Sequence, residues 1–260
     1  MKRLCAFLVC LCLVLSCGLV CAGEHLVIGV TPYPHKDIMT IAKTILEKKG
    51  YTVTIKEFTD YVQPNIALAH TLLFANYFQH KPYLDNMNAE KNLHLVSLGG
   101  VHIEPLGVYS KKIKQMAELS KGNTVSVPND PTNEARALRL LEAQGIIKVK
   151  AGDLVTVADI VDNPFQLKFF ELEAAQLPRA LDDVTMAVIN TNFAGEAGLI
   201  PSRDALAMES KDSPYANIVV VREEDKDSQA AKDLLAALQS EEVKHFIEQG
   251  LVHKGIVPAF

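Results

Sequence analysis

The chain has 260 residues, of which 48% are hydrophobic and 22% are charged, with 14 glycines and 12 prolines. This composition is typical of a globular protein and excludes a disordered, collagen-like or wholly coiled-coil chain. The formal net charge of −5 argues against a nucleic-acid partner, because neutralising phosphates requires a basic surface. All five cysteines lie within the first 21 residues, so the remaining chain has neither a disulfide framework nor a cysteine-ligated metal site.

Residues 1–22 have the pattern of an export signal. Met1-Lys2-Arg3 is a short basic region, and Leu4 to Leu15 is an apolar run of 12 residues, too short to span about 30 Å of hydrocarbon. Val14-Leu15-Ser16-Cys17 resembles a lipobox, which predicts acylation of Cys17 with chains such as palmitate and anchorage to a membrane. Two alternatives remain open: cleavage after Ala22, giving a soluble exported protein, and an uncleaved anchoring helix.

From Glu24 onward, short apolar runs alternate with segments of helical period, which predicts an α/β fold with mostly parallel sheets flanked by helices. N-capping by Asp130, a proline in the first helical position and a glycine after the last turn mark two of the helices. The predicted strands are His25–Val30, Tyr51–Phe58, Leu93–Leu98, Thr124–Val127, Met186–Ile189 and Ile218–Arg222. The predicted helices include Asp37–Lys49, Pro131–Gln144, Ser228–Ser240 and Glu241–Gln249.

The sequence predicts two lobes without a flexible linker. No Gly/Ser-rich or Pro-rich stretch divides the chain, so extended strands are expected to join the lobes, with Gly107–Ser110 and the stretch before Tyr215 as candidate crossings. This partition places residues 24–110 and 206–260 in one lobe and residues 111–205 in the other.

No pattern of a known catalytic site occurs. The nucleophile elbow, the zinc-protease motif, the P-loop and the dinucleotide fingerprint are all missing, and the eight histidines are scattered singly. We therefore expect a protein that is not an enzyme and that needs no cofactor or metal. A hydrolase or a metal-dependent enzyme remains an alternative.

Aromatic residues gather in the run Phe74–Tyr83, which holds four of the chain's Phe and Tyr residues. Because Pro82 interrupts a regular helix, we expect part of this run to be a loop that displays rings. Phe78, His80 and Tyr83, with Tyr61 from a nearby turn, suit a pocket wall for a small apolar or sulfur-bearing group. The alternative is that the rings close a hydrophobic core.

Polar residues mark three further positions. Residues 128–136 are a strand end followed by a helix start, where an anion is favoured and Arg136 can grip a carboxylate. A surface pairing of Arg136 with Glu134 or Asp130 is the alternative. Asn190 lies at the carboxyl end of a strand, where α/β folds place ligands, and Asn217 precedes a buried strand; a turn-forming asparagine is the alternative for both. Together these parts predict a zwitterionic ligand with an apolar tail.

Long segments of the chain are similar to the methionine-binding lipoproteins of ABC importers (the MetQ/NlpA family). The similarity runs from about Leu26 to the C-terminus, essentially the whole mature chain. The segments that carry it are Thr59–Asn65, Phe78–Asn86, His102-Ile103-Glu104-Pro105, Pro128–Asn133, Glu171–Asp183 and Ser213–Asn217.

The resemblance implies a hinged, two-lobed periplasmic-binding-protein-like fold, joined by two crossing strands, that closes on L-methionine. It implies delivery to an ABC permease with its ATPase subunits, from a lipid anchor in the bacterial cell envelope that faces the periplasm. It also implies the roles of eight residues: the thioether side chain is enclosed by Tyr61, Phe78, His80 and Tyr83, and the charged groups are held by Asn133, Arg136, Asn190 and Asn217. A receptor for another apolar amino acid or a short methionine-containing peptide, and a non-transport surface lipoprotein, are the alternatives.

Overall fold

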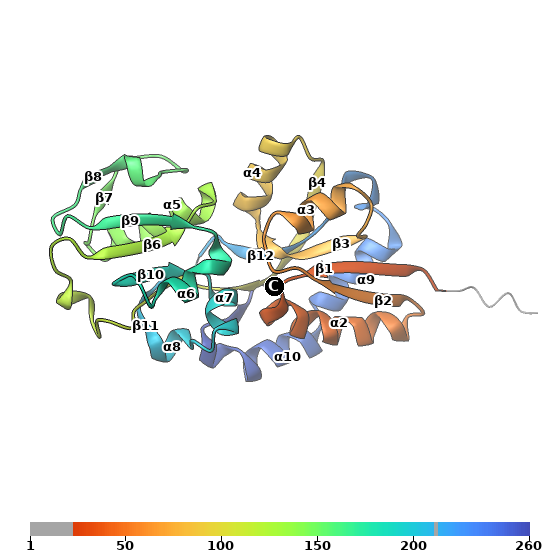
Figure 1. The fold of residues 1–260 in the computed structure, drawn as a ribbon. Coiled ribbons are helices and arrows are strands. Elements are labelled where there is room, and N and C mark those ends of the chain that lie inside the picture. Colours follow the sequence, from red (N-terminus) through yellow and green to blue (C-terminus); the bar gives the residue numbers. More distant parts are fainter. Residues whose placement is uncertain (1–22, 211–212) are drawn as a thin grey trace, which may run out of the picture.

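The computed structural model describes residues 23–210 and 213–260, which form two lobes side by side (Figure 1). The predicted lipidation site Cys17 and the rest of the signal region lie outside the described residues. Within the described ranges, no helix is both long enough and apolar enough to cross a bilayer.

Lobe 1 is built on a six-stranded sheet with the strand order β13-β4-β12-β3-β1-β2. Its strands are β1 (His25–Val30), β2 (Thr52–Glu57), β3 (Ala75–His80), β4 (Leu95–Ile103), β12 (Ala216–Arg222) and β13 (Val257–Pro258). Its helices are α2 (Asp37–Lys48), α3 (Gln63–Ala69), α4 (Lys81–Lys91), α9 (Gln229–Leu238) and α10 (Glu241–Gly250), with the short turns η1 (Pro32–Lys36), η5 (Glu223–Asp225) and η6 (Val252–Lys254).

Lobe 2 is built on a five-stranded sheet with the order β11-β5-β10-β6-β9 and carries a small two-stranded ribbon. The strands are β5 (Gly107–Tyr109), β6 (Thr124–Pro128), β9 (Lys168–Leu172), β10 (Met186–Ile189) and β11 (Ala205–Met208), and the ribbon is β7 (Lys148–Val149) with β8 (Ile160–Asp162). The helices are α5 (Pro131–Ala143), α6 (Leu177–Ala180), α7 (Thr191–Glu196) and α8 (Pro201–Asp204), with the turns η2 (Met116–Glu118), η3 (Val157–Asp159) and η4 (Ala174–Gln176).

The predicted α/β class and two-lobed architecture are confirmed, but the sheets are mixed in direction. β1 runs parallel to β2 and β3, and β6 runs parallel to β9 and β10. In contrast, β12 runs antiparallel to β3 and β4, and β5 runs antiparallel to β10 and β11. The antiparallel strands β5 and β12 each follow a crossing from one lobe to the other, so the chain enters each sheet from the opposite direction.

Helix α2 shows how the sequence builds the core of lobe 1. Ile38, Ala42 and Leu46 recur at four-residue intervals, so they share one face of the helix, and all three are fully buried in the core. Burying a large apolar side chain contributes about 1.5–3 kcal/mol. The helix is followed by Gly50 at φ 97°, a conformation that glycine adopts without strain.

The first crossing between the sheets differs from the prediction, whereas the second lies in the stretch before Tyr215, as predicted. Gly107–Tyr109 was expected to be a crossing, but it is strand β5, paired on both sides within the sheet of lobe 2. Residues 205–208 likewise belong to that sheet, as β11. The described residues of the crossings are therefore 104–106 for the first, and 209–210 and 213–215 for the second. As a division of the whole chain into lobes, the predicted residue ranges stay a prediction.

The aromatic run is not a loop. Residues 75–80 form the buried strand β3, and α4 begins directly at Lys81. Pro82 lies in the first turn of α4, where a missing N–H breaks no helical hydrogen bond. The prediction failed because it treated this proline as a helix breaker, although it stands at a helix start.

Candidate ligand-binding site

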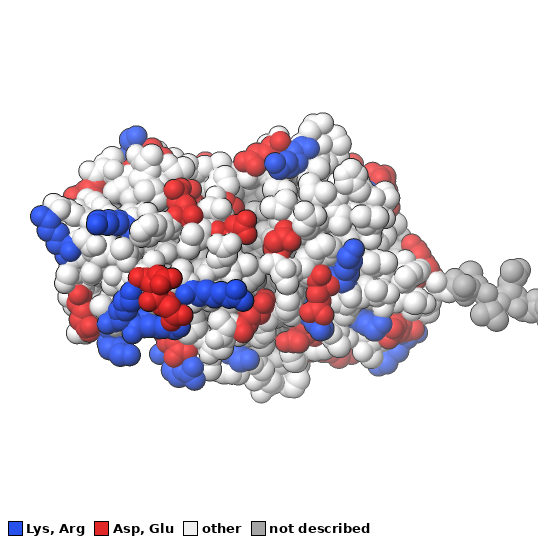
Figure 2. All heavy atoms as spheres, viewed as in Figure 1, with Lys and Arg blue, Asp and Glu red and all other residues white. Residues whose placement is uncertain are grey.

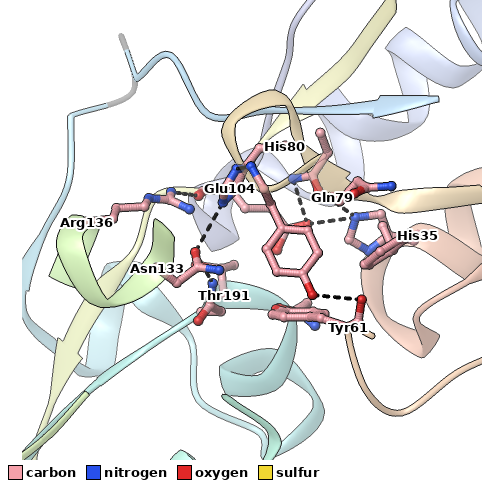
Figure 3. Close-up of a pocket in the computed structure, with 13 residues that line it drawn as sticks. His35, Tyr61, Gln79, His80, Glu104, Asn133, Arg136 and Thr191 are labelled. Atoms are coloured by element: carbon pink, nitrogen blue, oxygen red, sulfur yellow. Dashed lines mark hydrogen bonds and ion pairs between the residues drawn. The ribbon is translucent and has the colours of Figure 1, made fainter. Parts of the chain in front are cut away.

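A pocket lies where the two lobes meet, and all eight predicted site residues line it (Figure 3). Five further side chains complete its wall. The lining from lobe 1 and the first crossing is His35, Tyr61, Phe78, Gln79, His80, Tyr83, Glu104 and Asn217; that from lobe 2 is Asn133, Arg136, Asn190, Thr191 and Asn192. Residues more than 180 positions apart in the sequence thus share one cavity.

The junction of β3 and α4 fixes the orientation of His80. Its Nδ1 accepts a hydrogen bond from the backbone N–H of Tyr83 (3.2 Å), as an N-cap does. The proton of the neutral ring is therefore on Nε2, which donates across the pocket to Oδ1 of Asn133 in lobe 2 (3.2 Å). Burial, and then the charge of Arg136, lower the pKa of His80 to about 3, so the ring stays neutral.

Aromatic rings from both lobes pack around Tyr61. Its ring centroid lies 6.0 Å from those of Phe78 and Tyr83 in lobe 1, and 5.1 Å from that of Phe193 in lobe 2. The Tyr61 hydroxyl donates to Oδ1 of Asn192 (2.6 Å), which is also in lobe 2. Tyr61 therefore links the lobes through both its ring and its hydroxyl, and it closes one side of the pocket.

Helix α5 and the end of β10 bring amide groups to the lobe 2 side. Asp130 caps α5 and accepts hydrogen bonds from the backbone and side-chain N–H groups of Asn133 (2.9 and 3.0 Å). Oδ1 of Asn133 accepts from Nδ2 of Asn190 (3.0 Å). Two buried atoms at the pocket, Oδ1 of Asn190 and Nδ2 of Asn192, have no partner among the described residues. They offer a ligand one acceptor and one donor.

Arg136 is buried in the pocket wall, but neither of the two partners considered from the sequence holds it. Its Nε donates to Oε1 of Glu209 (2.7 Å), and its Nη2 donates to the other oxygen of that carboxylate and to the backbone carbonyl of Glu104 (2.8 Å). Both crossings between the lobes are thus tied to one guanidinium. Its Nη1 forms no hydrogen bond within the described part of the chain, and the guanidinium lies over the ring of Tyr215, 4.4 Å from its centroid.

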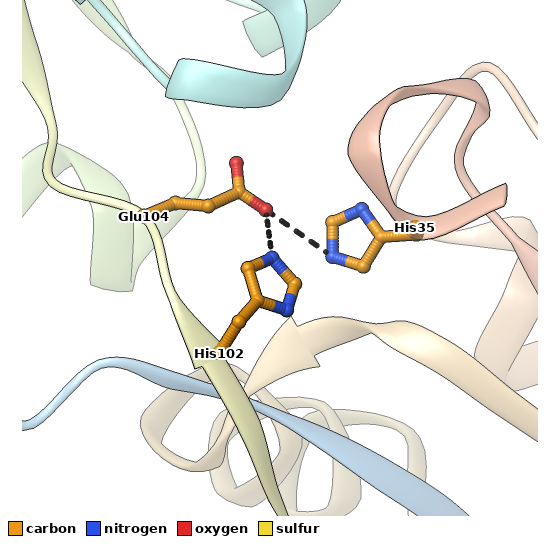
Figure 4. Close-up of side chains that lie close together, drawn as sticks. All are labelled: His35, His102 and Glu104. Carbon is orange, nitrogen blue, oxygen red and sulfur yellow. Dashed lines mark hydrogen bonds and ion pairs between the residues drawn. The ribbon is translucent and has the colours of Figure 1, made fainter. Parts of the chain in front are cut away.

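Glu104 lies on the first crossing and carries a buried carboxylate, next to two buried histidines (Figure 4). His102 Nε2 donates to Oε1 of Glu104 (2.7 Å), and His35 Nε2 lies 3.4 Å from the same oxygen. The atoms of these three side chains that could bind a metal ion lie within 4.8 Å of one another. However, both Nε2 atoms already lie next to the carboxylate oxygen. Desolvation lowers the pKa of His35 to about 4 and that of His102 to about 3.

Sequence reasoning missed several of these residues. His35, Gln79, Thr191 and Asn192 were not singled out, because each adjoins a predicted strand or turn without a distinctive spacing. Glu104 belongs to His102-Ile103-Glu104-Pro105, one of the segments that carry the family resemblance, so a signal was present.

The pocket is narrow. Its side chains leave about 30 Å³, which holds about two water molecules, so a solute of amino-acid size enters only after the walls separate. A larger cavity of about 480 Å³ lies on the other side of Tyr61 and Tyr83, lined by residues of both lobes including Asp60, Asp130 and Phe193. Figure 2 shows a notch in the molecular surface between the lobes. The two tyrosines are therefore the partition that a solute from this side has to pass.

Comparison with known proteins assigns the chain to a family. The model of the NlpA lipoproteins matches residues 26–260. The chain belongs to the NlpA lipoprotein family. Among similar members, "Outer membrane lipoprotein 3" of Mannheimia haemolytica is 50% identical, over 85% of both chains. The "D-methionine-binding lipoprotein MetQ" of Salmonella typhimurium is 47% identical, over 85% of this chain and 83% of its own.

Solved structures agree with this assignment. A nutrient-binding protein from Burkholderia cenocepacia, determined bound to methionine, has 48% sequence identity and a TM-score of 0.88; the match covers 90% of this chain and all of that one. The methionine-binding protein MetQ has 43% identity and a TM-score of 0.87, with 91% and 98% of the chains covered. The resemblance to the NlpA family found in the sequence is thereby confirmed.

Proposed function

We propose that this chain is a solute-binding receptor that captures methionine between its two lobes and delivers it to an ATP-driven importer. The observation that carries the proposal is the composition of the pocket. It combines aromatic rings for a thioether with one carboxylate and one guanidinium for a zwitterion. Relatives described as methionine-binding share 43–48% of the sequence, which supports the same ligand.

Binding of this kind depends on closure. Exposed ion pairs yield only about 0–1 kcal/mol, whereas pairs enclosed by both lobes are worth more because water is excluded. The lining comes from both lobes, so a ligand in the pocket contacts each of them and favours the closed arrangement over the open one. The protein acts by capture and release, without a chemical step.

The eight predicted residues keep their proposed roles. Tyr61, Phe78, His80 and Tyr83 enclose the side chain of the ligand, while the amides and Arg136 hold its charged groups. We further propose that Cys17 carries the lipid anchor that keeps the receptor at the cell envelope, facing the periplasm. The lipoprotein names of the relatives support this location.

The test is a binding panel on protein stripped of bound solute by unfolding and refolding. Calorimetry and thermal unfolding are carried out with L-methionine, D-methionine, leucine and a glycyl-methionine dipeptide. We expect methionine to bind most tightly and to raise the melting temperature, and the two enantiomers to reveal the stereochemical preference. A protein that binds leucine or the dipeptide more tightly, or none of the panel, would contradict the proposal.

A further inference from the structure

Glu104 is the acidic side chain of the pocket, and several donors hold its carboxylate in one orientation. His102 donates to Oε1 at 2.7 Å, and Nδ2 of Asn217 lies 3.4 Å from the same oxygen. The hydroxyl of Tyr77 contacts the other ring nitrogen of His102, and Thr31 contacts that of His35 at 2.7 Å. These contacts fix both rings, so that Nε2 of His102 donates to Glu104, whereas Nε2 of His35 is hydrogen-bonded to Oδ1 of Asn217 (3.1 Å) and lies 3.4 Å from the Glu104 carboxylate.

This buried carboxylate lacks a cationic partner in the described structure. Glu104 is only 6% exposed, and no lysine or arginine of residues 23–210 and 213–260 forms an ion pair with it. Arg136 is the nearest candidate, but its guanidinium is paired with Glu209 and reaches only the backbone carbonyl of Glu104. Buried carboxylates are rarely left without a positive partner, because desolvation of an unpaired charge is costly.

The charges of the pocket complement those of a free amino acid. Arg136 and Glu104 carry the opposite formal charges of the lining, since His35 and His80 are neutral, and an amino acid carries one ammonium and one carboxylate. Arg136 suits the carboxylate, which leaves Glu104 for the ammonium. The unpartnered Oδ1 of Asn190, which lines the same pocket from lobe 2, offers a second acceptor for an ammonium N–H.

We propose that Glu104 is the counter-ion of the ligand's α-ammonium group, and that His102 is a positioning residue that aims its carboxylate into the pocket. The inference rests on the proposed function and deepens it, since it assigns the group that selects amino acids over compounds without an amine. Neutral asparagine amides cannot provide this selection alone, because they do not supply the compensating charge.

The experiment compares methionine with the analogue in which hydrogen replaces the α-amino group. Calorimetry on the full chain gives the ratio of the two affinities. Loss of folding or of closure weakens the binding of both compounds by the same factor, so it leaves the ratio of affinities unchanged. The wild type should prefer methionine by about 100-fold or more, and Glu104→Gln, which keeps the shape of the side chain, should reduce the preference to below about 10-fold. Glu47→Gln, an exposed carboxylate on α2, is the matched control and should keep the wild-type ratio.

An unchanged ratio in Glu104→Gln, or a wild type that binds both compounds equally, would overturn this inference and leave methionine capture intact. A wild type that does not bind methionine would instead overturn the proposed function. The positioning role has its own test, because a glutamine amide at position 102 can still donate to Glu104 and an alanine cannot. We expect His102→Gln to retain a ratio about 10-fold higher than His102→Ala. Equal ratios in these two variants would overturn the positioning role.

Discussion

Arg136 joins both crossings between the lobes at the residue scale, and its side chain lines the pocket. Arg136→Ala should weaken methionine binding by at least about 2 kcal/mol, because a buried ligand carboxylate loses its partner. Calorimetry measures the loss. Arg139→Ala, one turn along α5 and bound to Glu142 at the surface, should bind as the wild type does. Equal affinities in the two variants would show that Arg136 does not contact the ligand.

The hydroxyl of Tyr61 gives a second prediction at this scale. It is the donor of a hydrogen bond between the lobes, to Asn192 (2.6 Å). Tyr61→Phe keeps the ring and removes about 1 kcal/mol of closed-state stabilisation, so methionine should dissociate about five times faster in stopped-flow measurements. Tyr51→Phe removes a hydroxyl bonded to Asp233 within lobe 1 and is the control. An unchanged dissociation rate in Tyr61→Phe would exclude a role of this bond in closure.

Individual site residues could be predicted where the local sequence marks the end or the start of a strand. Asn190 follows one predicted strand and Asn217 precedes another, so the sequence indicated their positions. The partner of Arg136 was not predictable, because Glu209 lies 73 positions away and meets it only through the antiparallel pairing of β5 and β11. Glu104 was missed for the same reason: its two histidines come from η1 and from β4.

At the scale of elements, the first turn of α5 positions the amide of Asn133. Asp130→Ala removes the N-cap, so the free energy of unfolding should fall by about 1 kcal/mol. Methionine affinity should fall as well, because the Asn133 side chain loses its anchor. Ser240→Ala removes the equivalent cap of α10, far from the pocket, and should lower stability alone. Urea unfolding and calorimetry separate the two effects, and equal affinity losses in both variants would contradict this account.

Glu134, also in this turn, predicts a dependence of stability on pH. Burial, together with the neighbouring Glu171, raises the pKa of its carboxyl from 4.5 to about 7. The folded chain therefore binds the proton more tightly, so this group's contribution is fully present below pH 4.5 and is lost as the pH rises through about 7. Relative to Glu134→Gln, the wild type should lose stability across this range in urea titrations. A constant difference between the two proteins would show that the carboxyl titrates normally.

Strands and helices were predictable where burial and periodicity agree. The N-cap of α5 at Asp130 and the C-terminal end of α2 before Gly50 follow from capping and glycine signals, and the structure has them there. The run from Phe74 to Tyr83 was misjudged because a proline in a first helical turn and a proline that ends a helix look alike in sequence. The antiparallel direction of β5 and β12 could not be predicted from local sequence patterns either, since it depends on where the chain crosses between the lobes.

At the scale of the whole molecule, capture requires the lobes to separate and close again. The pocket of about 30 Å³ is smaller than its proposed ligand, and its walls come from both lobes, so the two sheets have to move relative to each other during exchange. Arg136 bonds to Glu104 on the first crossing and to Glu209 on the second. This arrangement is that of a hinge with a single charged link near the ligand.

The most direct test of capture by closure is the distance between the lobes with and without methionine. Spin labels are attached through Glu90→Cys on α4 and Asp162→Cys on β8, two exposed positions, in a chain from Gly23 onward that contains no native cysteine. Pulsed electron paramagnetic resonance then gives the distance distribution. We predict that saturating methionine shifts it toward a shorter, narrower distance and that lysine leaves it unchanged. The same distribution before and after methionine binds would contradict the account.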